Sequence, residues 1–389
     1  MSKRGLRLLW ALLGLGLVVR LALAFTTYGV AFDVEAFILA RDGLRDAPLT
    51  VYGDIERWPY PPGYFAWIAF SGWLAGPTGL DYTNLLQLPS IFADLAIAAM
   101  VQAVLGKRGA GERTRLAGAG LVALGPVFLM VSGYHGQIDS IAILPAFAGV
   151  VLWSYWDHPA RAAGAGLLIG LGGVLKTVPI VLVLALLPWA RSRREGALLL
   201  ASAAAVPFFV ILPFALADPG GVAHALDYRG APGVGGISLA AQPNLARAWM
   251  NEVAVTPSGA TFWLIDYGSA ITGVAMVSVA VFLLRYRPRP IEGAALIYLA
   301  LWAFGVNFFL QYLVWGLPFL LAAGYVREVA AAQVLIVPAL VLVYLRPWES
   351  PAAAWVYAPA SIGLWVASVA GFWLLARRVA GGSRARAPA

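Results

Sequence analysis

The first residues that could do chemistry are two acids placed directly after the first apolar run of the chain. Asp33 and Glu35 stand in the stretch AFDVEAFILA, close to the expected border of a membrane. A charge at the centre of a spanning helix costs about 2.5–3.5 kcal/mol, so ionisable residues beside such a helix usually serve a function. The alternative is that both are solvated loop acids, like Asp42 and Asp46 nearby.

Further polar residues stand in turns between later apolar segments. The stretch SGYHGQIDSI carries three polar groups within five residues, a lysine follows in VLKTVPIV, and a Gln-Tyr pair stands in VNFFLQYLVW. On the expected topology these turns share one side of the membrane with Asp33, which predicts one cavity there. The alternatives are a self-satisfying turn, a lysine that anchors a helix end, and hydrogen bonds between helices. The residues concerned are His135, Gln137, Asp139, Lys176, Gln311 and Tyr312.

The segment RWPYPPGYF lies in the same loop as the two acids. Two successive prolines make it a stiff turn, because each proline restricts the residue before it to an extended conformation. Arg57 offers a cation, and aromatic rings offer faces against which a sugar ring could stack. The rings are those of Trp58, Tyr60, Tyr64 and, from a later segment, Trp315.

Composition places these residues in a membrane protein. The chain is 61% hydrophobic and 12% charged, whereas a soluble domain carries about 25% charged residues. We expect an all-α polytopic fold and a single integral-membrane domain over 1–389. It would have about 12 spanning helices, with juxtamembrane helices in the first extracytoplasmic loop. The expected spans are 7–28, 83–105, 115–133, 139–156, 161–176, 178–191, 196–217, 260–285, 290–310, 313–326, 328–345 and 354–376.

The distribution of basic residues orients these spans. Most Lys and Arg residues fall on one side if the N-terminus is cytoplasmic, as the positive-inside rule requires. This predicts a multi-pass protein with both termini in the cytoplasm, and it makes 29–82 and 218–259 extracytoplasmic loops. The apolar stretch 63–77 is too short to span and is expected to lie at the interface. Within the membrane, Asp94 needs a partner, for which Arg20 is a candidate.

Charge and residue usage limit the cofactors and partners. The net charge of +8 is explained by cytoplasmic loops and gives no reason to expect nucleic acid. The chain contains no Cys, which excludes a Cys-based metal site. Asp33, Glu35, His135 and Asp139 could meet around a hard cation, but no ligand spacing demands one. We therefore expect no metal and no required cofactor, with a divalent cation left open.

The ordered set of motifs resembles the C-type (GT-C) glycosyltransferases, membrane enzymes that use polyprenyl-phosphate sugars. The run DVEAF…LTVYG…YPPGYF resembles their first outer loop, and YHGQIDS resembles a His-x-Gln-x-acid turn of the glucose-dependent branch. LKTVPIVLVLALLP and NFFLQYLVWGLPFL resemble later motifs, the second from the mannosyltransferase branch. The likeness covers about 7–320. Leu310 stands where that branch has Pro, and the first-loop motif is Asp-x-Glu where the family has adjacent acids.

The resemblance implies a glycosyltransferase that moves a single sugar from a polyprenyl-phosphate carrier to an extracytoplasmic lipid or glycan acceptor. The enzyme itself would be surrounded by membrane lipids. Mannose is favoured over glucose or a pentose. Asp33 would be the general base of an inverting displacement. Glu35 would assist it if 31–36 is irregular, because i and i+2 diverge in a straight helix. The class that competes with this one is a secondary transporter or lipid flippase.

The remaining site residues are expected to bind the substrates. The cations that would hold the donor phosphate are, in order of preference, Lys176, His135 and Arg57. The residues expected to contact the sugars are Trp58, Tyr60, Tyr64, Gln137, Asp139, Gln311 and Tyr312.

Overall fold

The computed structural model describes residues 1–55, 57–227, 233–251, 253–306, 308–345 and 352–384. The described chain is helical and contains no β-strand, which confirms the all-α fold class. It divides into two compact units. Unit 1 comprises Met1–Val183 and Ala190–Tyr228, and unit 2 comprises Leu184–Trp189 and Arg229–Ala389. The single integral-membrane domain expected over 1–389 stays a prediction.

Unit 1 holds the expected catalytic loop and the spans before residue 218. Its elements, in chain order, are α1 (Lys3–Thr26), α2 (Ala31–Asp46), α3 (Val51–Asp54), η1 (Pro62–Tyr64), α4 (Phe65–Thr78), α5 (Tyr82–Lys107), α6 (Glu112–Ala123), α7 (Pro126–Phe128), η2 (Leu129–His135), α8 (Asp139–Tyr155), α9 (Arg161–Leu175), η3 (Val178–Leu182), the first residue of α10 (Val183–Leu186), α11 (Arg193–Ala217) and α12 (Pro219–Leu226).

Unit 2 holds the rest of α10 and the later helices. Its elements are η4 (Leu187–Trp189), α13 (Gly236–Ala241), α14 (Leu245–Met250), α15 (Ala260–Asp266), α16 (Gly268–Tyr286), α17 (Pro290–Phe304), η5 (Leu310–Tyr312), α18 (Leu313–Ala323), α19 (Val326–Leu340), η6 (Val341–Leu345) and α20 (Ala353–Arg384). α17 packs against α16, α18 and α20.

Seven helical segments of the described chain are long and apolar enough to cross a membrane. Five further apolar segments are shorter than a usual span and coincide with expected spans. The polytopic prediction is therefore confirmed, while the count of about 12 stays a prediction. The seven are Lys3–Thr26, Tyr82–Lys107, Glu112–His135, Arg193–Ala217, Gly268–Tyr286, Val326–Leu345 and Ala353–Gly382. The five are Asp139–Tyr155, Arg161–Leu175, Val178–Trp189, Pro290–Phe304 and Leu310–Ala323.

Several expected spans differ from single regular helices, and two of them illustrate how. The span expected over 260–285 is broken between α15 and α16 at Tyr267, so only α16 is long enough to cross by itself. The segment 178–189 alternates between 3₁₀ and α geometry. Pro179 and Pro188 explain this, because proline lacks the N–H that a regular helix needs.

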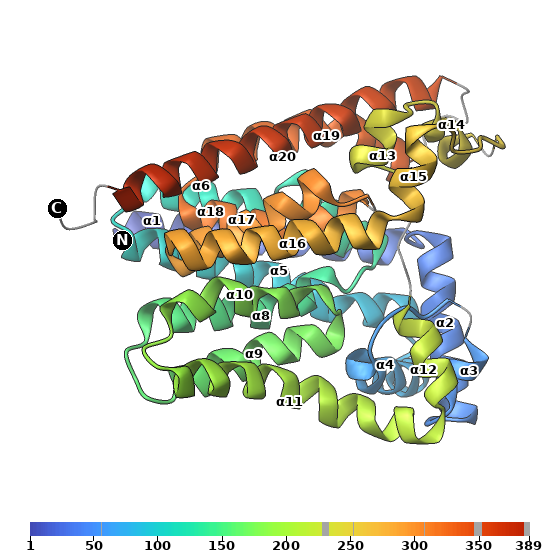
Figure 1. Cartoon of the computed structure of the whole chain (residues 1–389). Coiled ribbons are helices and arrows are strands. Elements are labelled where there is room, and N and C mark those ends of the chain that lie inside the picture. The colour runs from blue at the N-terminus through green and yellow to red at the C-terminus, as the bar shows by residue number, and fades with distance from the viewer. Residues whose placement is uncertain (56, 228–232, 252, 307, 346–351, 385–389) are drawn as a thin grey trace. The chain divides into compact units, whose positions relative to one another are not determined.

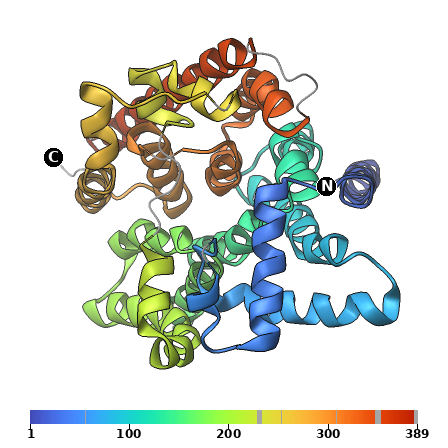
Figure 2. The same cartoon turned by 90° about the vertical axis from the view of Figure 1, so that its right-hand side faces the viewer.

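The short helices of unit 1 gather at one end of its long helices. α5 packs against α1, α6 and α8, and α9 packs between α8 and α11. Figures 1 and 2 show α2 and α4 lying across the direction of these long helices. The predicted helix in 63–77 is thus present as α4, and its crosswise course fits a helix at the membrane surface. We call this end of unit 1 the α2 end.

The opposite end of unit 1 carries the basic loops. Ser2 contacts Glu112 through its backbone N and its hydroxyl, at 2.7 and 2.8 Å. Lys107 Nζ lies 5.0 Å from the ring centroid of Tyr155. The basic loops thus lie at the end of unit 1 opposite the α2 end, which agrees with the sequence prediction, and the side of the membrane that each end faces stays a prediction.

Candidate functional site

Asp33 and His135 form the centre of the α2 end. Asp33 lies in the first turn of α2, where the helix dipole favours a carboxylate. Its Oδ2 contacts Nε2 of His135, the last residue of η2. The Asp33 side chain is 27% exposed and the His135 side chain 1%. Asp33 is therefore accessible to a substrate, while His135 holds it from the buried side.

Glycine lets the start of α2 approach the His135 turn. Gly29 has a φ of +81°, in the left-handed region that side chains disfavour. A Cβ built on it would lie 2.9 Å from the carbonyl oxygen of Tyr134 and 3.2 Å from that of His135. The contact between Asp33 and His135 thus depends on a residue without a side chain at position 29.

Gly29→Ala is expected to destabilise the fold by about 1–2 kcal/mol from the backbone conformation alone, and to lower transfer activity further because α2 must shift away from His135. Thermal unfolding in detergent and an activity assay measure the two effects. Gly14→Ala is the control, because nothing lies within 4 Å of a Cβ at that position of α1. Wild-type activity and stability in Gly29→Ala would show that the close approach is not needed.

An ion pair lies beside the contact between Asp33 and His135. Lys176 directly follows α9, and its Nζ donates to Oδ1 of Asp139 at 2.7 Å. Asp139 begins α8 and is completely buried. The same Nζ lies 5.0 Å from the ring centroid of Tyr60, a cation–π distance. The structure therefore brings the lysine and the acid of two sequence motifs together, as a buried pair capped by an aromatic ring.

Tyr60 joins the proline-rich loop to the His135 turn. Its hydroxyl donates to Oε1 of Gln137 at 3.5 Å, and its backbone carbonyl accepts from the hydroxyl of Tyr52 at 2.9 Å. Gly63 lies so close to the end of α9 that a Cβ would come within 2.5 Å of the carbonyl oxygen of Val174. The stiff Tyr-Pro-Pro-Gly turn thus places Tyr60 beside Lys176 and Gln137.

Electrostatics keep Asp33 charged. Burial would raise the pKa of Asp33, but attraction by His135, hydrogen bonds from His135 and Gln137, and the charge of Lys176 together lower it below its ordinary value of 3.8. Because the folded-state pKa is depressed, the carboxylate stabilises the fold at pH values above its unfolded pKa. That stability is lost as the pH falls through the lowered folded value.

His135→Ala is expected to move the acid limb of the kcat/KM profile to higher pH. The substitution removes the largest influence that lowers the pKa of Asp33 and leaves the effect of burial, so a general base at this position would become protonated at higher pH. His158→Ala is the control, because His158 stacks on Trp156 near the end opposite Asp33. An unshifted acid limb would contradict the coupling between His135 and Asp33.

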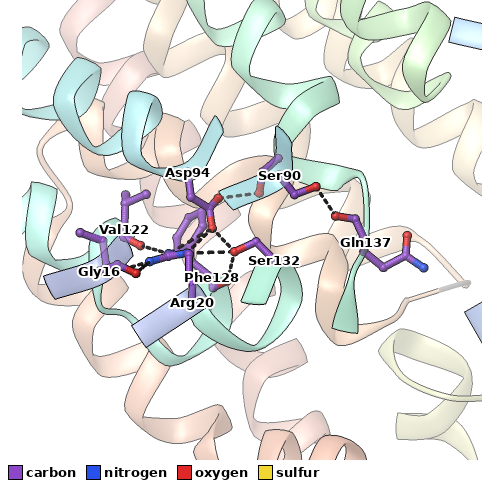
Figure 3. A network of polar contacts seen from close by, with 10 residues as sticks. Gly16, Arg20, Ser90, Asp94, Val122, Phe128, Ser132 and Gln137 are labelled. Atoms are coloured by element: carbon purple, nitrogen blue, oxygen red, sulfur yellow. Dashed lines mark hydrogen bonds and ion pairs between the residues drawn. The ribbon is translucent and has the colours of Figure 1, made fainter. Parts of the chain in front are cut away.

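A buried network of polar side chains links α5 to the segment that contains Ser132 and Gln137 (Figure 3). Asp94 and Arg20 form a completely buried ion pair, with 3.0 Å between Oδ2 and Nη2, which confirms the predicted partner. Asp94 also accepts hydrogen bonds from the hydroxyls of Ser132, at 2.6 Å, and Ser140, at 2.5 Å. One turn earlier, Ser90 donates to the carbonyl of Gln137 at 2.6 Å. Three hydrogen bonds therefore connect the side chains of α5 to the segment 132–140.

Glu35 does not share the site of Asp33. α2 is a regular helix from Ala31 onward, so the irregularity that would let both acids face one site is absent. Glu35 instead pairs with Arg57, with 3.3 Å between Oε2 and Nη1, and both side chains are exposed. Arg57 also lies over the ring of Phe32, at 4.7 Å from its centroid. The expected catalytic assistance by Glu35 is not supported by this geometry.

Trp58 and Tyr64 are core residues. Trp58 is 2% exposed and packs with its centroid 5.3 Å from that of Phe37. Tyr64 is equally enclosed and donates its hydroxyl to the carbonyl of Leu86 at 2.5 Å. Neither ring presents a face on which a sugar could stack, so the expectation is corrected for both. The expectation came from the aromatic residues of this loop, and aromatic side chains suit a buried cluster as well as a sugar site.

Gln311 and Tyr312 belong to unit 2. Both lie in η5, and Tyr312 stacks on Trp315 with 4.1 Å between ring centroids. The stacked ring occupies one face of Trp315, which is itself buried. Their expected place in the cavity of Asp33 stays a prediction, because it concerns residues of different units.

Sequence reasoning paired Asp94 with Arg20 but missed Gln87 and Ser90, which lie on the same helix beside the site. Gln87, Ser90 and Asp94 are spaced by three and four positions, which places them on one face of a helix. Polar residues at that spacing inside an apolar helix would have indicated a polar neighbour. For a metal, no group of three or more His, Asp or Glu side chains lies together within the described ranges of the chain. The expectation that no cation is required is left to a chelation assay.

The crosswise helices, the apolar spans and the partly exposed acid at their end define a polytopic membrane protein with a candidate catalytic carboxylate. The sequence model of glycosyltransferase family 87 matches residues 58–304. The chain therefore belongs to glycosyltransferase family 87, a GT-C-type family of polytopic membrane glycosyltransferases. The matched range includes His135 and Lys176, and it begins after Asp33. No curated protein matches the chain.

Proposed function

We propose that this membrane glycosyltransferase moves a single sugar from a polyprenyl-phosphate carrier to a lipid or glycan acceptor, with Asp33 as the general base. The observation that carries the proposal is the partly exposed Asp33 carboxylate, held by His135 at the end of unit 1 where α2 and α4 run crosswise. A lipid-linked donor and a hydroxyl acceptor can both reach an acid placed at the membrane surface.

The proposed reaction is one inverting displacement. The acceptor hydroxyl oxygen attacks the anomeric carbon while Asp33 takes the hydroxyl proton, and the bond between that carbon and the phosphate oxygen breaks. The polyprenyl phosphate leaves with the bonding electrons and needs little protonation. One carboxylate is therefore enough, which agrees with the separation of Glu35 from Asp33.

The geometry changes the order of the cations proposed for the donor phosphate. Lys176 is neutralised by the buried Asp139 and His135 is held by Asp33. Arg57 pairs with the exposed Glu35, and an exposed ion pair contributes about 0–1 kcal/mol. A phosphate can therefore displace Glu35 from Arg57 more easily than Asp139 from Lys176, and we rank Arg57 first.

Arg57→Gln is expected to raise the KM for the donor about tenfold, because one charge-assisted hydrogen bond contributes about 1.5–3 kcal/mol. The KM for the acceptor should stay unchanged. Arg45→Gln is the control, since Arg45 is an exposed arginine of α2 that pairs with Asp46. If the donor KM does not change in Arg57→Gln, Lys176 becomes the preferred cation for the donor phosphate.

A panel of polyprenyl-phosphate sugars tests the proposed donor. Mannose is favoured, with glucose and a pentose as the other sugars. Consumption of one donor, with release of polyprenyl phosphate and an inverted product linkage, is the expected result. Donor turnover that is unaffected by exhaustive chelation would support catalysis without a metal. If vesicles containing the protein move a labelled solute and no donor is consumed, a secondary transporter or flippase becomes the better assignment.

The absence of Cys from the chain allows a direct test of orientation. We propose that the α2 end is extracytoplasmic and that both termini are cytoplasmic. Glu35→Cys should react with a membrane-impermeant thiol reagent added outside intact cells, because Glu35 is exposed. Ala110→Cys, between α5 and α6, should react only after the membrane is opened. The reverse pattern would invert the topology.

A further inference from the structure

Gln87 is a buried polar residue to which neither the family nor the proposed reaction assigns a role. It lies in α5 and is 1% exposed. Neither its Oε1 nor its Nε2 has a hydrogen-bond partner within the part of the chain that the structure describes. Each buried polar group without a partner costs about 1–3 kcal/mol. Such a group in a folded protein therefore calls for an explanation.

The side chain of Gln87 lies over the turn that carries the site. A Cβ built on Gly136 would lie 3.3 Å from Cγ of Gln87, 3.4 Å from its Cδ and 3.5 Å from its Nε2. Gly136 stands between His135, which holds the general base, and Gln137, which accepts from Tyr60. The amide of Gln87 is therefore next to the residues that the proposed reaction uses.

The position of this amide is fixed by α5. Ser90, one turn further along the helix, donates to the carbonyl of Gln137 at 2.6 Å. Asp94, one turn beyond that, accepts from Ser132 and Ser140 on the two sides of the turn. The same helix face thus carries two groups that hold the turn and a third group whose hydrogen bonds are not made within the described protein.

The hydrogen-bonding groups of an amide indicate what kind of ligand it would bind. Nε2 donates two hydrogen bonds and Oε1 accepts, so the group as a whole complements a hydroxyl, which also donates and accepts. A phosphate offers acceptors only and would leave Oε1 unmatched, while a metal ion would leave Nε2 unmatched. Neighbouring hydroxyl groups on a sugar ring satisfy both ends.

We infer that Gln87 is a substrate-binding residue whose amide recognises sugar hydroxyl groups at the His135 turn. This rests on the proposed function, which supplies a sugar on the donor and, for a glycan acceptor, a second one. A substrate-binding amide explains why the chain keeps a costly group at this position.

Gln87→Met tests the inference, because methionine has a similar shape and no amide. Removing a buried amide that makes no internal hydrogen bond should leave the thermal midpoint unchanged or raise it. The value of kcat/KM should fall about 10- to 100-fold, the range for losing one or two hydrogen bonds to a substrate. A glutamine with a purely structural role would give the opposite pattern, with stability lost first.

Gln102→Met is the matched control. Gln102 is a buried glutamine of the same helix, about four turns further on, and its Nε2 contacts Sδ of Met1 at 3.0 Å. Its replacement should leave kcat/KM near the wild-type value. Unchanged kcat/KM in Gln87→Met, or equal losses of activity in both variants, would overturn the inference.

Deoxy substrates identify which sugar Gln87 binds. Wild-type enzyme should reject a donor or an acceptor that lacks the recognised hydroxyl, and Gln87→Met should no longer distinguish it from the full sugar. If Gln87→Met loses discrimination in the donor series alone, Gln87 binds the transferred sugar. If it loses discrimination in the acceptor series alone, Gln87 binds the acceptor. Discrimination retained in both series would contradict a role in hydroxyl recognition.

A binding measurement separates this inference from the proposed donor class. Methyl glycosides carry the sugar hydroxyls without a lipid phosphate, and a series of them can be tested for a rise in the thermal midpoint of the wild type. If no polyprenyl-phosphate sugar is consumed, the proposed donor fails. A rise that occurs in the wild type and is absent in Gln87→Met would still support sugar binding by Gln87. Identical shifts, or none in either protein, would count against it.

Discussion

Asp33→Asn is expected to lower the rate of sugar transfer by about 10²–10⁴-fold, the usual contribution of a general base. Asparagine has nearly the same shape and can still contact His135, but it cannot accept the proton of the acceptor hydroxyl. Expression and the KM for the donor should change little, because the packing of α2 stays in place. The thermal midpoint should fall, because the neutral amide loses the stabilisation that the charged Asp33 gains from His135 and Lys176. Single-turnover assays with a labelled donor measure the loss of transfer rate.

Asp42→Asn is the control for this experiment. Asp42 lies on the same helix and pairs with Arg41, with 2.9 Å between Oδ1 and Nη2, at a partly exposed position. Its replacement should leave transfer within about twofold of wild type, because exposed ion pairs contribute little to stability. Turnover by Asp33→Asn at the rate of Asp42→Asn would end the assignment of Asp33 as base.

Asp94→Leu is expected to destabilise the protein by about 3–5 kcal/mol, the cost of leaving a buried charge without its partner. The guanidinium of Arg20 would keep its contacts to the carbonyls of Gly16 and Val122 but lose its ion pair with the carboxylate of Asp94. The hydroxyls of Ser132 and Ser140 would also lose an acceptor. Transfer activity should fall with stability, since both serines flank the His135 turn.

The double variant Arg20→Met with Asp94→Leu distinguishes the charge from the hydrogen bonds. Removing both charges should recover much of the stability, because replacing a buried ion pair by apolar side chains is often neutral. Activity should stay reduced, since neither serine regains its acceptor. Recovery of full activity would show that the network does not position the turn, and a double variant as unstable as Asp94→Leu would contradict the account of the uncompensated charge.

The elements of unit 1 could be predicted from sequence to within a few residues where long apolar runs end in charged loops, as at Lys3–Thr26 and Tyr82–Lys107. The meeting of Asp33 with His135 was also foreseeable, because both stand in turns on the same side of the expected topology. Lys176 and Asp139 were placed on that side too, but hydropathy orders the segments along the chain and does not say which side chains of these turns pair.

The remaining errors have one physical origin. Trp58 and Tyr64 were expected to face a sugar because their ring chemistry allows it, yet the cluster around Phe37 and Phe65 buries both. Burial of this kind depends on contacts between residues far apart in the chain. The role of Gln87 was missed for the same reason, because only the position of Gly136 shows what its side chain lies against.

The division of the chain has a consequence for how the protein is made. Leu184–Trp189 is part of unit 2, where the indole of Trp189 donates to the carbonyl of Pro288 at 2.5 Å, 99 residues later in the sequence. This short stretch is therefore synthesised well before its partners in unit 2. All of α11 and α12 is translated in between. If the gene is divided after residue 228, Leu184–Trp189 is made on a different chain from the rest of unit 2. The two halves are therefore expected to need co-expression to regain activity.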